Sequence, residues 1–326
     1  MQKKSLRVIG WLLKIAIVFL AFYYIYHQLF EERNMRQLFT EFRQLVRWNE
    51  LPGILLVVFL MLFNWSLEAA KWRYLVKKIE DISFGKALVA VFSGITVSVF
   101  TPNKIGEYGG RVFHLKSEHR LDAVVITLVG SMMQLGVTLL GGLITAPFFY
   151  AKYHKGDDYV QEYFFYGLLF VTFSFLGVLA LAFFRRMLLK KALHRMGFLE
   201  RARKYGKALT FYHRRELWFV FRMCLARYVV FSTQLYLLLW TFDVYLSFIQ
   251  ALLFIPLIFF MITVIPRPLA FAELGVRAST ALYFLTYLNA DQTGVLLAMF
   301  SLWMLNLAVP ALLGSIFILR MRIFGR

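Results

Sequence analysis

The chain has little of what most enzymes need. It contains one cysteine, Cys224, and its six histidines are scattered rather than paired at metal-ligand spacing. A single thiol excludes an internal disulfide and a cysteine-based metal site. The sequence also lacks the GxSxG, Walker A and HExxH patterns of hydrolases, P-loop proteins and zinc peptidases. We therefore expect no catalytic residues, no metal and no cofactor, and predict that the protein is not an enzyme.

Apolar residues are abundant instead. The sequence is 60% hydrophobic and 18% aromatic, with a mean hydropathy of +0.64. Several apolar runs exceed the roughly 18 residues that cross a bilayer core. The net charge of +19 is typical either of a nucleic-acid-binding protein or of cytoplasmic loops that lie on anionic lipid. The second interpretation fits these apolar runs, so we predict an all-α polytopic membrane protein that does not bind nucleic acid.

A short motif occurs twice. Residues 102–111 read P-N-K-I-G-E-Y-G-G-R, and residues 268–277 read P-L-A-F-A-E-L-G-V-R. Proline, glutamate, glycine and arginine recur at the same relative positions, at an offset of 166 residues. Each motif follows a short apolar run and brings charge to a segment that a membrane protein would normally keep apolar. Matching interruptions in two halves of a chain are typical of a transporter substrate site.

Hydropathy and charge divide the chain into four segments. They are an N-terminal span with an interfacial helix (1–50), a first repeat (51–184), a basic cytoplasmic loop (185–216) and a second repeat (217–326). The run at 87–101 is roughly 22 Å long as a helix, which is shorter than a bilayer core.

The positions of the charges favour hairpins over crossings. If residues 87–120 and 248–288 are re-entrant helical hairpins, every basic loop lies in the cytoplasm, as do both termini. About six full transmembrane helices then remain. Three crossings separate the starts of the two repeats, which makes the repeat inverted and the hairpins opposed.

The repeated motifs supply the first candidate substrate-binding residues. Glu107 and Arg111 are four residues apart, as are Glu273 and Arg277, so each pair shares a helix face. If the hairpins meet, four charged groups converge. A helix that starts after each proline would also turn free N–H groups toward an anion. The pairs either take part in moving a substrate or ion, or act as internal staples that hold the hairpins.

Further charged residues extend this candidate site. Glu68, Lys71 and Arg73 either snorkel beside two tryptophans or line a cytoplasmic vestibule that collects an anionic head group, with Lys104 at the same entrance. Arg227 lies about ten residues into an apolar run, where a charge is costly. For Gln134 and Gln234, each a single polar residue on a long span, we expect interhelical hydrogen bonds.

These residues resemble a known family. The stretches N-W-x-x-E-A-x-K-W-R-x-L (64–75), T-P-x-K-x-G-E-Y-x-G-R (101–111) and I-P-R-P-x-x-x-x-E-L-G-V-R (265–277) are similar to the lysylphosphatidylglycerol synthase/flippase transmembrane domain family. The resemblance covers roughly residues 8–320. It departs at Ala270 and Ala272, where glycines are common. It implies an integral protein of the bacterial inner membrane, with the Glu–Arg pairs in the family's hairpins.

The resemblance also implies an activity. Family synthases carry a soluble domain after the membrane region, whereas this chain ends seven residues after the last apolar run. We therefore expect no synthase activity, and predict a flippase-like transporter of an anionic phospholipid or lipid-linked head group. The alternatives are an intramembrane transferase acting on lipid or polyprenyl substrates, and a non-catalytic partner of a separate synthase or glycosyltransferase. Expected partners are anionic membrane lipids, with a homo-oligomer also open.

Overall fold

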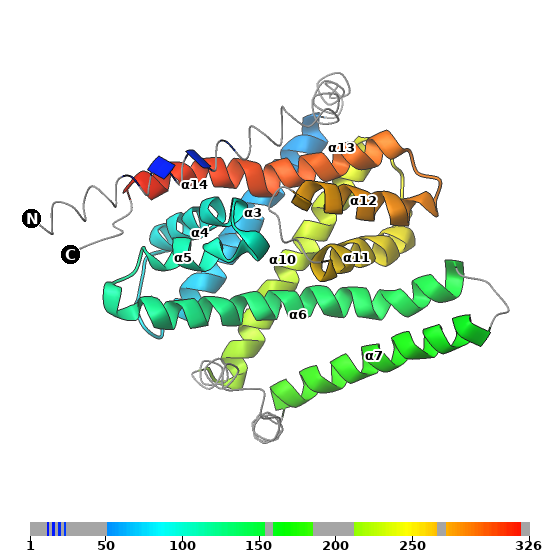
Figure 1. Cartoon of the computed structure of the whole chain (residues 1–326), viewed down its shortest axis with the longest axis horizontal. Helices are drawn as coiled ribbons and strands as arrows, with labels where there is room; N and C mark the ends of the chain where they lie inside the picture. The colour runs from blue at the N-terminus through cyan, green and yellow to red at the C-terminus, as the bar shows by residue number, and fades with distance from the viewer. Residues whose placement is uncertain are drawn as a thin grey trace, which may run out of the picture.

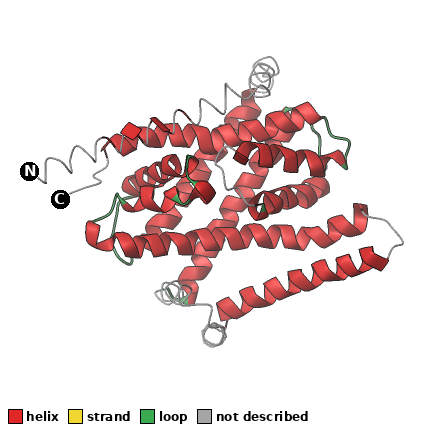
Figure 2. Ribbon diagram, in the orientation of Figure 1, coloured by secondary structure: helices red, strands yellow, loops and turns green. Residues whose placement is uncertain are grey.

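The computed structural model describes residues 51–153, 159–184, 212–265 and 272–320, together with Leu12, Ile15, Ala16, Phe19, Leu20 and Tyr23. All secondary structure within these residues is helical (Figure 2). Several predictions fall wholly or mostly outside them: the N-terminal span with its interfacial helix (1–50), the basic loop (185–216) and the start of the second motif with Pro268.

Four helical segments of the described chain are long and apolar enough to cross a membrane. They are α3 (Leu51–Val76), α6 (Arg120–Tyr153), α10 (Arg214–Thr241) and the continuous Gln292–Leu319. α7 (Tyr159–Phe184) is 26 residues long and lies beside α6, where the Thr172 hydroxyl donates to the Leu143 carbonyl at 2.9 Å (Figure 1). The protein is thus a multi-pass helical membrane protein, as predicted, whereas the predicted total of six spans is not tested.

The last spanning segment contains a local change of helix type. It consists of α13 (Gln292–Trp303), the π-helical turn η4 (Met304–Ala308) and α14 (Val309–Arg320). Asp291 caps its start, since its carboxylate accepts the Gly294 N–H at 2.7 Å. Asn306 lies within η4 and is buried. Single π-turns inside α-helices are frequent at functional sites.

Two pairs of short helices fill the space between the long ones. The first consists of α4 (Phe84–Val99), the 3₁₀ turn η2 (Pro102–Lys104) and α5 (Gly106–Val112), with a second turn η3 (Ser117–His119) behind it. The second pair is α11 (Phe248–Val264) and α12 (Ala272–Thr286). α4 and α11 have 16 and 17 residues, so both are shorter than a bilayer core about 30 Å thick.

The first pair is joined by a sharp break in the backbone. α4 ends at Val99, just before Pro102, because a residue that precedes proline disfavours the α conformation. Asn103 and Lys104 then adopt left-handed conformations, with φ of 49° and 58°. Such backbone is uncommon for residues with a side chain, and it reverses the chain so that α5 returns along α4 (Figure 1).

The order of elements recurs and the two halves pack reciprocally. A long helix, two short helices and another long segment occur as α3–α6 and again as α10–α14. α4 packs on α14, where the Thr96 hydroxyl donates to the Ala311 carbonyl at 2.7 Å. α11 packs on α6, where the rings of Phe149 and Phe254 lie 5.6 Å apart. Each short pair therefore rests on the long segment of the other half.

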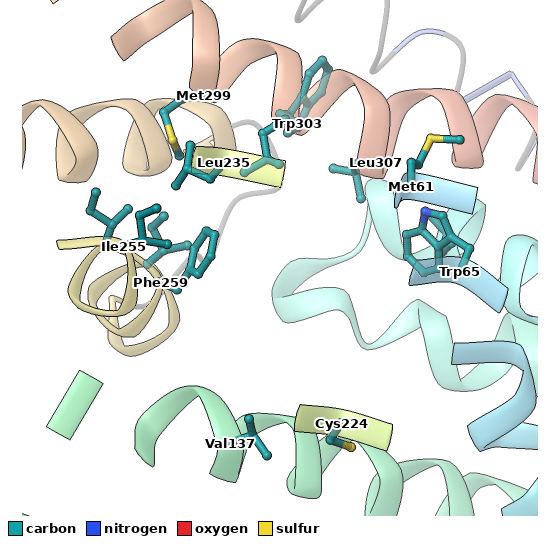
Figure 3. Packing of buried hydrophobic residues seen from close by; sticks show 14 of the residues in the cluster. Met61, Trp65, Val137, Cys224, Leu235, Ile255, Phe259, Met299, Trp303 and Leu307 are labelled. Atoms are coloured by element: carbon teal, nitrogen blue, oxygen red, sulfur yellow. The ribbon is translucent and has the colours of Figure 1, made fainter. Parts of the chain in front are cut away.

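The apolar core lies where these elements meet. Figure 3 shows Trp65 on α3, Phe259 on α11, Trp303 on α13 and Leu307 on η4 around one central space. All four side chains are buried. Because four elements from both halves contribute to it, this centre is the natural place for a site shared by the two motifs.

Candidate functional site

A buried carboxylate, Glu68, organises the charged residues. It lies on α3 and is only 4% exposed. Lys71, one turn further along α3, places its Nζ 2.6 Å from Glu68 Oε2. Arg111 of α5 donates to Glu68 Oε1 at 2.8 Å, and Arg227 of α10 donates to Glu68 Oε2. Three cations from three elements thus converge on one carboxylate, which is the arrangement that a buried charge requires.

The first motif is built around Arg111. Its guanidinium also donates to Glu107, four residues earlier on α5. The space for this side chain comes from α4, because a Cβ on Gly94 would lie 2.7 Å from Arg111 Cγ. Likewise a Cβ on Gly110 would lie 2.6 Å from Gly94 Cα, so two glycines let the helices approach closely.

Arg227 joins this cluster to the opposite half. Its Nε donates to Asn64 Oδ1 at 3.1 Å and its Nη1 to Gln134 Oε1 at 3.2 Å, and its guanidinium lies 5.6 Å from the Trp65 ring centre. Asn64 in turn donates to Asn306 Oδ1 at 3.4 Å. Through these bonds α3, α6, α10 and the π-turn share one polar network in an otherwise apolar centre.

The second motif forms a similar pair with a different partner. Arg277 donates to Glu273 Oε1 at 2.9 Å within α12. Lys104, at the break between α4 and α5, places its Nζ 2.9 Å from the same oxygen. The first short-helix pair therefore contacts the second directly, through a lysine of one motif and the carboxylate of the other.

A cavity of about 270 Å³ lies between the two clusters. Its charged lining residues are Lys104, Glu107, Arg227 and Arg277. Its other lining residues come from α3, α4, α6, α10, α11, α13 and η4; they are Asn64, Trp65, Ile95, Ser98, Gln134, Thr138, Tyr228, Phe231, Phe259, Ile262, Thr263, Leu302, Trp303, Asn306 and Leu307. Both repeated motifs thus reach one internal space.

Not every predicted site residue is brought there. Arg73 lies apart on the exposed side of α3, where it donates to the Ile82 carbonyl at 2.8 Å. Glu68 and Lys71 are buried in a protein interior rather than placed at a surface, which differs from the snorkelling interpretation. The reason is that Arg111 and Arg227 reach Glu68 from other elements, and local spacing on α3 cannot reveal them.

The predicted helix N-terminus of the first motif differs from expectation. After Pro102 the chain first forms the turn η2, and the Gly106 N–H that begins α5 donates to the Thr101 hydroxyl at 2.9 Å. The first turns of α5 and α12 contain Glu107 and Glu273, whose carboxylates stabilise the positive helix ends. The corresponding prediction for Pro268 stays a prediction, because that proline lies outside the described residues.

The sequence matches a known protein family. A family model described as the lysylphosphatidylglycerol synthase TM region matches residues 11–322. The chain belongs to the lysylphosphatidylglycerol synthase TM region family. The match spans nearly the whole chain and includes every residue of the cavity. No match was found among curated proteins or among solved structures.

Membership of the lysylphosphatidylglycerol synthase TM region family confirms the resemblance inferred from three motifs. It identifies the chain as a membrane domain and is consistent with a transporter-like or flippase-like role. The motifs that suggested the family contain Glu68, Glu107, Arg111, Glu273 and Arg277, which form the two charged clusters. Of these residues Glu107 and Arg277 line the cavity, whereas Glu68, Arg111 and Glu273 pair with residues of its wall.

Sequence reasoning missed two polar residues of the network around Arg227. Asn64, on α3, and Asn306, on the last span, are not among the predicted site residues, although asparagines within apolar runs are costly unless paired. That signal could have found both. Gln134 was expected to bond another helix, and it does, donating to the Cys224 carbonyl at 3.3 Å.

Proposed function

We propose that the protein is a flippase-like transporter that passes an anionic phospholipid or lipid-linked head group across the bacterial cytoplasmic membrane. One observation carries this proposal: a cavity whose charged lining is three cations and one carboxylate, drawn from both motifs and from α10. Membership of a membrane-domain family supports it. Buried charge is expensive in a membrane protein and marks substrate or ion pathways.

The two short-helix pairs act as opposed re-entrant hairpins in this proposal. Irregular backbone at membrane depth is tolerated only where protein buries it or where it lines a cavity. The left-handed residues Asn103 and Lys104 satisfy that condition, since Lys104 lines the cavity. The reciprocal packing of α4 on α14 and α11 on α6 is what an inverted repeat would produce. Both termini then lie in the cytoplasm.

Transport in this scheme needs exchange of partners rather than bond chemistry. Arg227 is shared by Glu68, Gln134 and Asn64, while Arg277 pairs with Glu273. A phosphate oxygen would compete for the same N–H donors and carry the head group from one arginine to the other. The lipid tails stay beside the apolar outer faces of the helices. In this scheme no covalent bond of the lipid is made or broken, so the protein acts as a transporter and not as an enzyme.

Reconstituted liposomes test this function. The protein should move a fluorescent anionic phospholipid between leaflets, and Glu107→Gln or Arg277→Ala should abolish the movement while leaving the protein folded. Arg222→Gln is the matched control, because Arg222 is an exposed arginine on α10 that lies over the Phe219 ring and does not line the cavity. Unchanged movement in both cavity variants would refute the site. Conversion of the lipid into a new chemical species would support an intramembrane transferase instead.

Labelling tests the topology separately. Single cysteines at Lys116 and Tyr287, introduced after Cys224→Ser, should react with a membrane-impermeant maleimide from opposite faces of oriented vesicles. Lys116 follows the first short-helix pair and Tyr287 follows α12. Labelling of both positions from the same face would exclude opposed hairpins, whatever the lipid assay shows.

A further inference from the structure

The wall of the cavity has an unbalanced charge. Lys104, Arg227 and Arg277 line it, against the single carboxylate of Glu107, which leaves two excess positive charges. Two carboxylates lie directly behind the wall: Glu68 pairs with Lys71, Arg111 and Arg227, and Glu273 pairs with Lys104 and Arg277. Five cations thus share three carboxylates, so the cluster as a whole keeps two excess positive charges.

Two tryptophans of the cavity wall carry hydrogen-bond donors without acceptors. The buried indole Nε1–H groups of Trp65 and Trp303 have no hydrogen-bond partner among the described residues. An indole N–H can only donate. Both nitrogens are shielded from the cavity surface, so an oxygen-rich ligand would satisfy these costly donors only if the tryptophans turn on binding.

The size of the cavity limits what can enter. Its volume of about 270 Å³ is at the lower end of ligand pockets, which run from about 300 to 1,000 Å³. A phosphate group with a small substituent fits this volume, and because the cavity is open rather than enclosed, the acyl chains of a lipid would lie outside it. The selective part of a lipid is therefore its head group.

From these three observations we infer that the cavity prefers a dianionic phosphate monoester head group to a monoanionic phosphodiester. This inference rests on the proposed function and specifies its substrate class. A dianion neutralises both excess charges of the wall, whereas a monoanion leaves one cation uncompensated in a low-dielectric interior, which is costly. A terminal phosphate also offers three exposed oxygens to the lysine and the two arginines of the wall.

Two synthetic lipids with the same acyl chains test the effect of the charge on the phosphate group. Dioctanoyl phosphatidic acid and dioctanoyl phosphatidylmethanol differ by one methyl group and one ionisation. At pH 8 the monoester should bind the detergent-solubilised protein at least about ten-fold more tightly, a difference of about 1.4 kcal/mol. At pH 5 the preference should disappear, because a phosphate monoester loses its second charge near pH 6. The diester, measured at both pH values, controls for titration of the protein.

A pair of variants tests the charge count from both sides. Lys104→Gln removes one positive charge from the wall and Glu107→Gln removes its one negative charge, and both residues belong to the same short connection. The ratio of diester to monoester dissociation constants should fall below the wild-type value in Lys104→Gln and rise above it in Glu107→Gln. A purely structural role would shift the ratio in the same direction in both. Thermal unfolding of each variant confirms that it is folded.

The outcomes distinguish this inference from the proposed function. Equal binding of the two lipids at pH 8 overturns the preference for a dianion and leaves an anionic-lipid site intact. Absence of binding by either lipid overturns the proposed function itself. Inorganic phosphate provides the third arm: much weaker binding than that of phosphatidic acid supports a lipid ligand. Equal binding would assign the site to free phosphate and overturn the lipid transport proposal.

Discussion

The two Glu–Arg motifs have the same spacing but are held in different ways. In the first, the Arg111 side chain is 3% exposed and is bonded both to Glu107 and to Glu68 of α3. In the second, the Arg277 side chain is 12% exposed and pairs with Glu273 in its own helix. The first arginine is fixed to a long helix, whereas the second stays at the cavity wall.

The repeat offset explains this difference. At an offset of 166 residues, Glu68 of α3 corresponds to Gln234 of α10. Gln234 is buried and donates to the Val57 carbonyl at 3.0 Å, but an amide has no charge with which to hold an arginine. The second half thus lacks the buried carboxylate that fixes the first motif. The second motif is held instead by the ion pair between Glu273 and Lys104 of the first pair.

The comparison suggests a division of labour between the halves. The first short-helix pair is braced by the ion network around Glu68 and by close glycine contacts, whereas in the described part of the second pair Arg277 has only Glu273 as its carboxylate and Gly275 makes no close contact. An element with fewer buried contacts opens at lower free energy. We therefore expect the second pair to be the part that moves against a fixed first pair, and the following predictions test that asymmetry.

The largest effect on the free energy of unfolding is expected at Glu68, in comparison with the corresponding buried position Gln234. Glu68→Gln leaves Lys71, Arg111 and Arg227 around a neutral group, so the free energy of unfolding should fall by about 3–5 kcal/mol. Gln234→Leu removes a single hydrogen bond and should change it by less than about 1 kcal/mol. Reversible unfolding in mixed micelles measures both. Similar losses at the two positions would remove the asymmetry.

A glycine-to-alanine substitution should lower the free energy of unfolding in the first pair and raise it in the second. Gly110→Ala places a methyl group 2.6 Å from Gly94 Cα, which must separate α4 from α5 and cost about 1–3 kcal/mol. Gly275 on α12 has nothing within 4 Å of an added Cβ, so Gly275→Ala should stabilise that helix by up to about 1 kcal/mol. Unfolding midpoints under identical conditions provide the measurement. A destabilising Gly275→Ala would show that the second pair is as tightly packed as the first.

A smaller effect concerns the link between the pairs. Lys104→Gln and Glu273→Gln, alone and combined, form a double-mutant cycle with an expected coupling of about 1 kcal/mol. The partly exposed pair Lys86–Glu80, whose atoms lie 2.8 Å apart, should couple by less than that. A coupling near zero for Lys104 and Glu273 would mean that the second motif is not held through the first.

The smallest effect lies in the loop after α3. Burial raises the pKa of Glu80, but hydrogen bonds from Lys86 Nζ and the Lys116 N–H, with their charges, hold it below its usual value of 4.5. Its contribution is therefore present above about pH 4.5 and is lost as the pH falls through the lowered value.

Replacement of Glu80 should make the free energy of unfolding depend less on pH in the acid range. Glu80→Gln should lower the free energy of unfolding by less than about 1 kcal/mol at neutral pH, and the difference from wild type should vanish below the pKa of Glu80. The corresponding position in the second half holds the buried Leu246, so no equivalent tie exists there. A difference between wild type and variant that persists at low pH would contradict this assignment.

Periodicity and charge in the sequence predicted much of this architecture. The apolar runs at 51–75, 121–150 and 217–242 are α3, α6 and α10 within a few residues. The short runs at 87–101 and 248–265 are α4 and α11. These features are local, since run length alone sets whether a helix can cross a bilayer. The Glu–Arg spacing likewise predicted both intrahelical pairs, because residues four apart share a helix face.

Contacts between distant segments could not be predicted in this way. Nothing in the spacing of α3 indicates that Arg227, 159 residues away, reaches Glu68. The link from Lys104 to Glu273 likewise depends on how two helix pairs are placed in space. The π-turn at Met304–Ala308 could not be predicted either, since Asn306 within it and Pro310 after it do not by themselves specify a change of helix type.

That π-turn has a consequence for the phase of the last helix. Each residue advances an α-helix by about 100°, and a π-turn accommodates one residue more than a regular turn would. α13 can therefore present one stripe to α10 and α12, while α14 presents a different stripe to α4. Deletion of one residue between Met304 and Ala308 would restore a uniform screw and rotate one end out of phase with its neighbours. Asn306 would then turn away from Asn64, and the hydrogen bond between these side chains, which joins the two halves, would be lost.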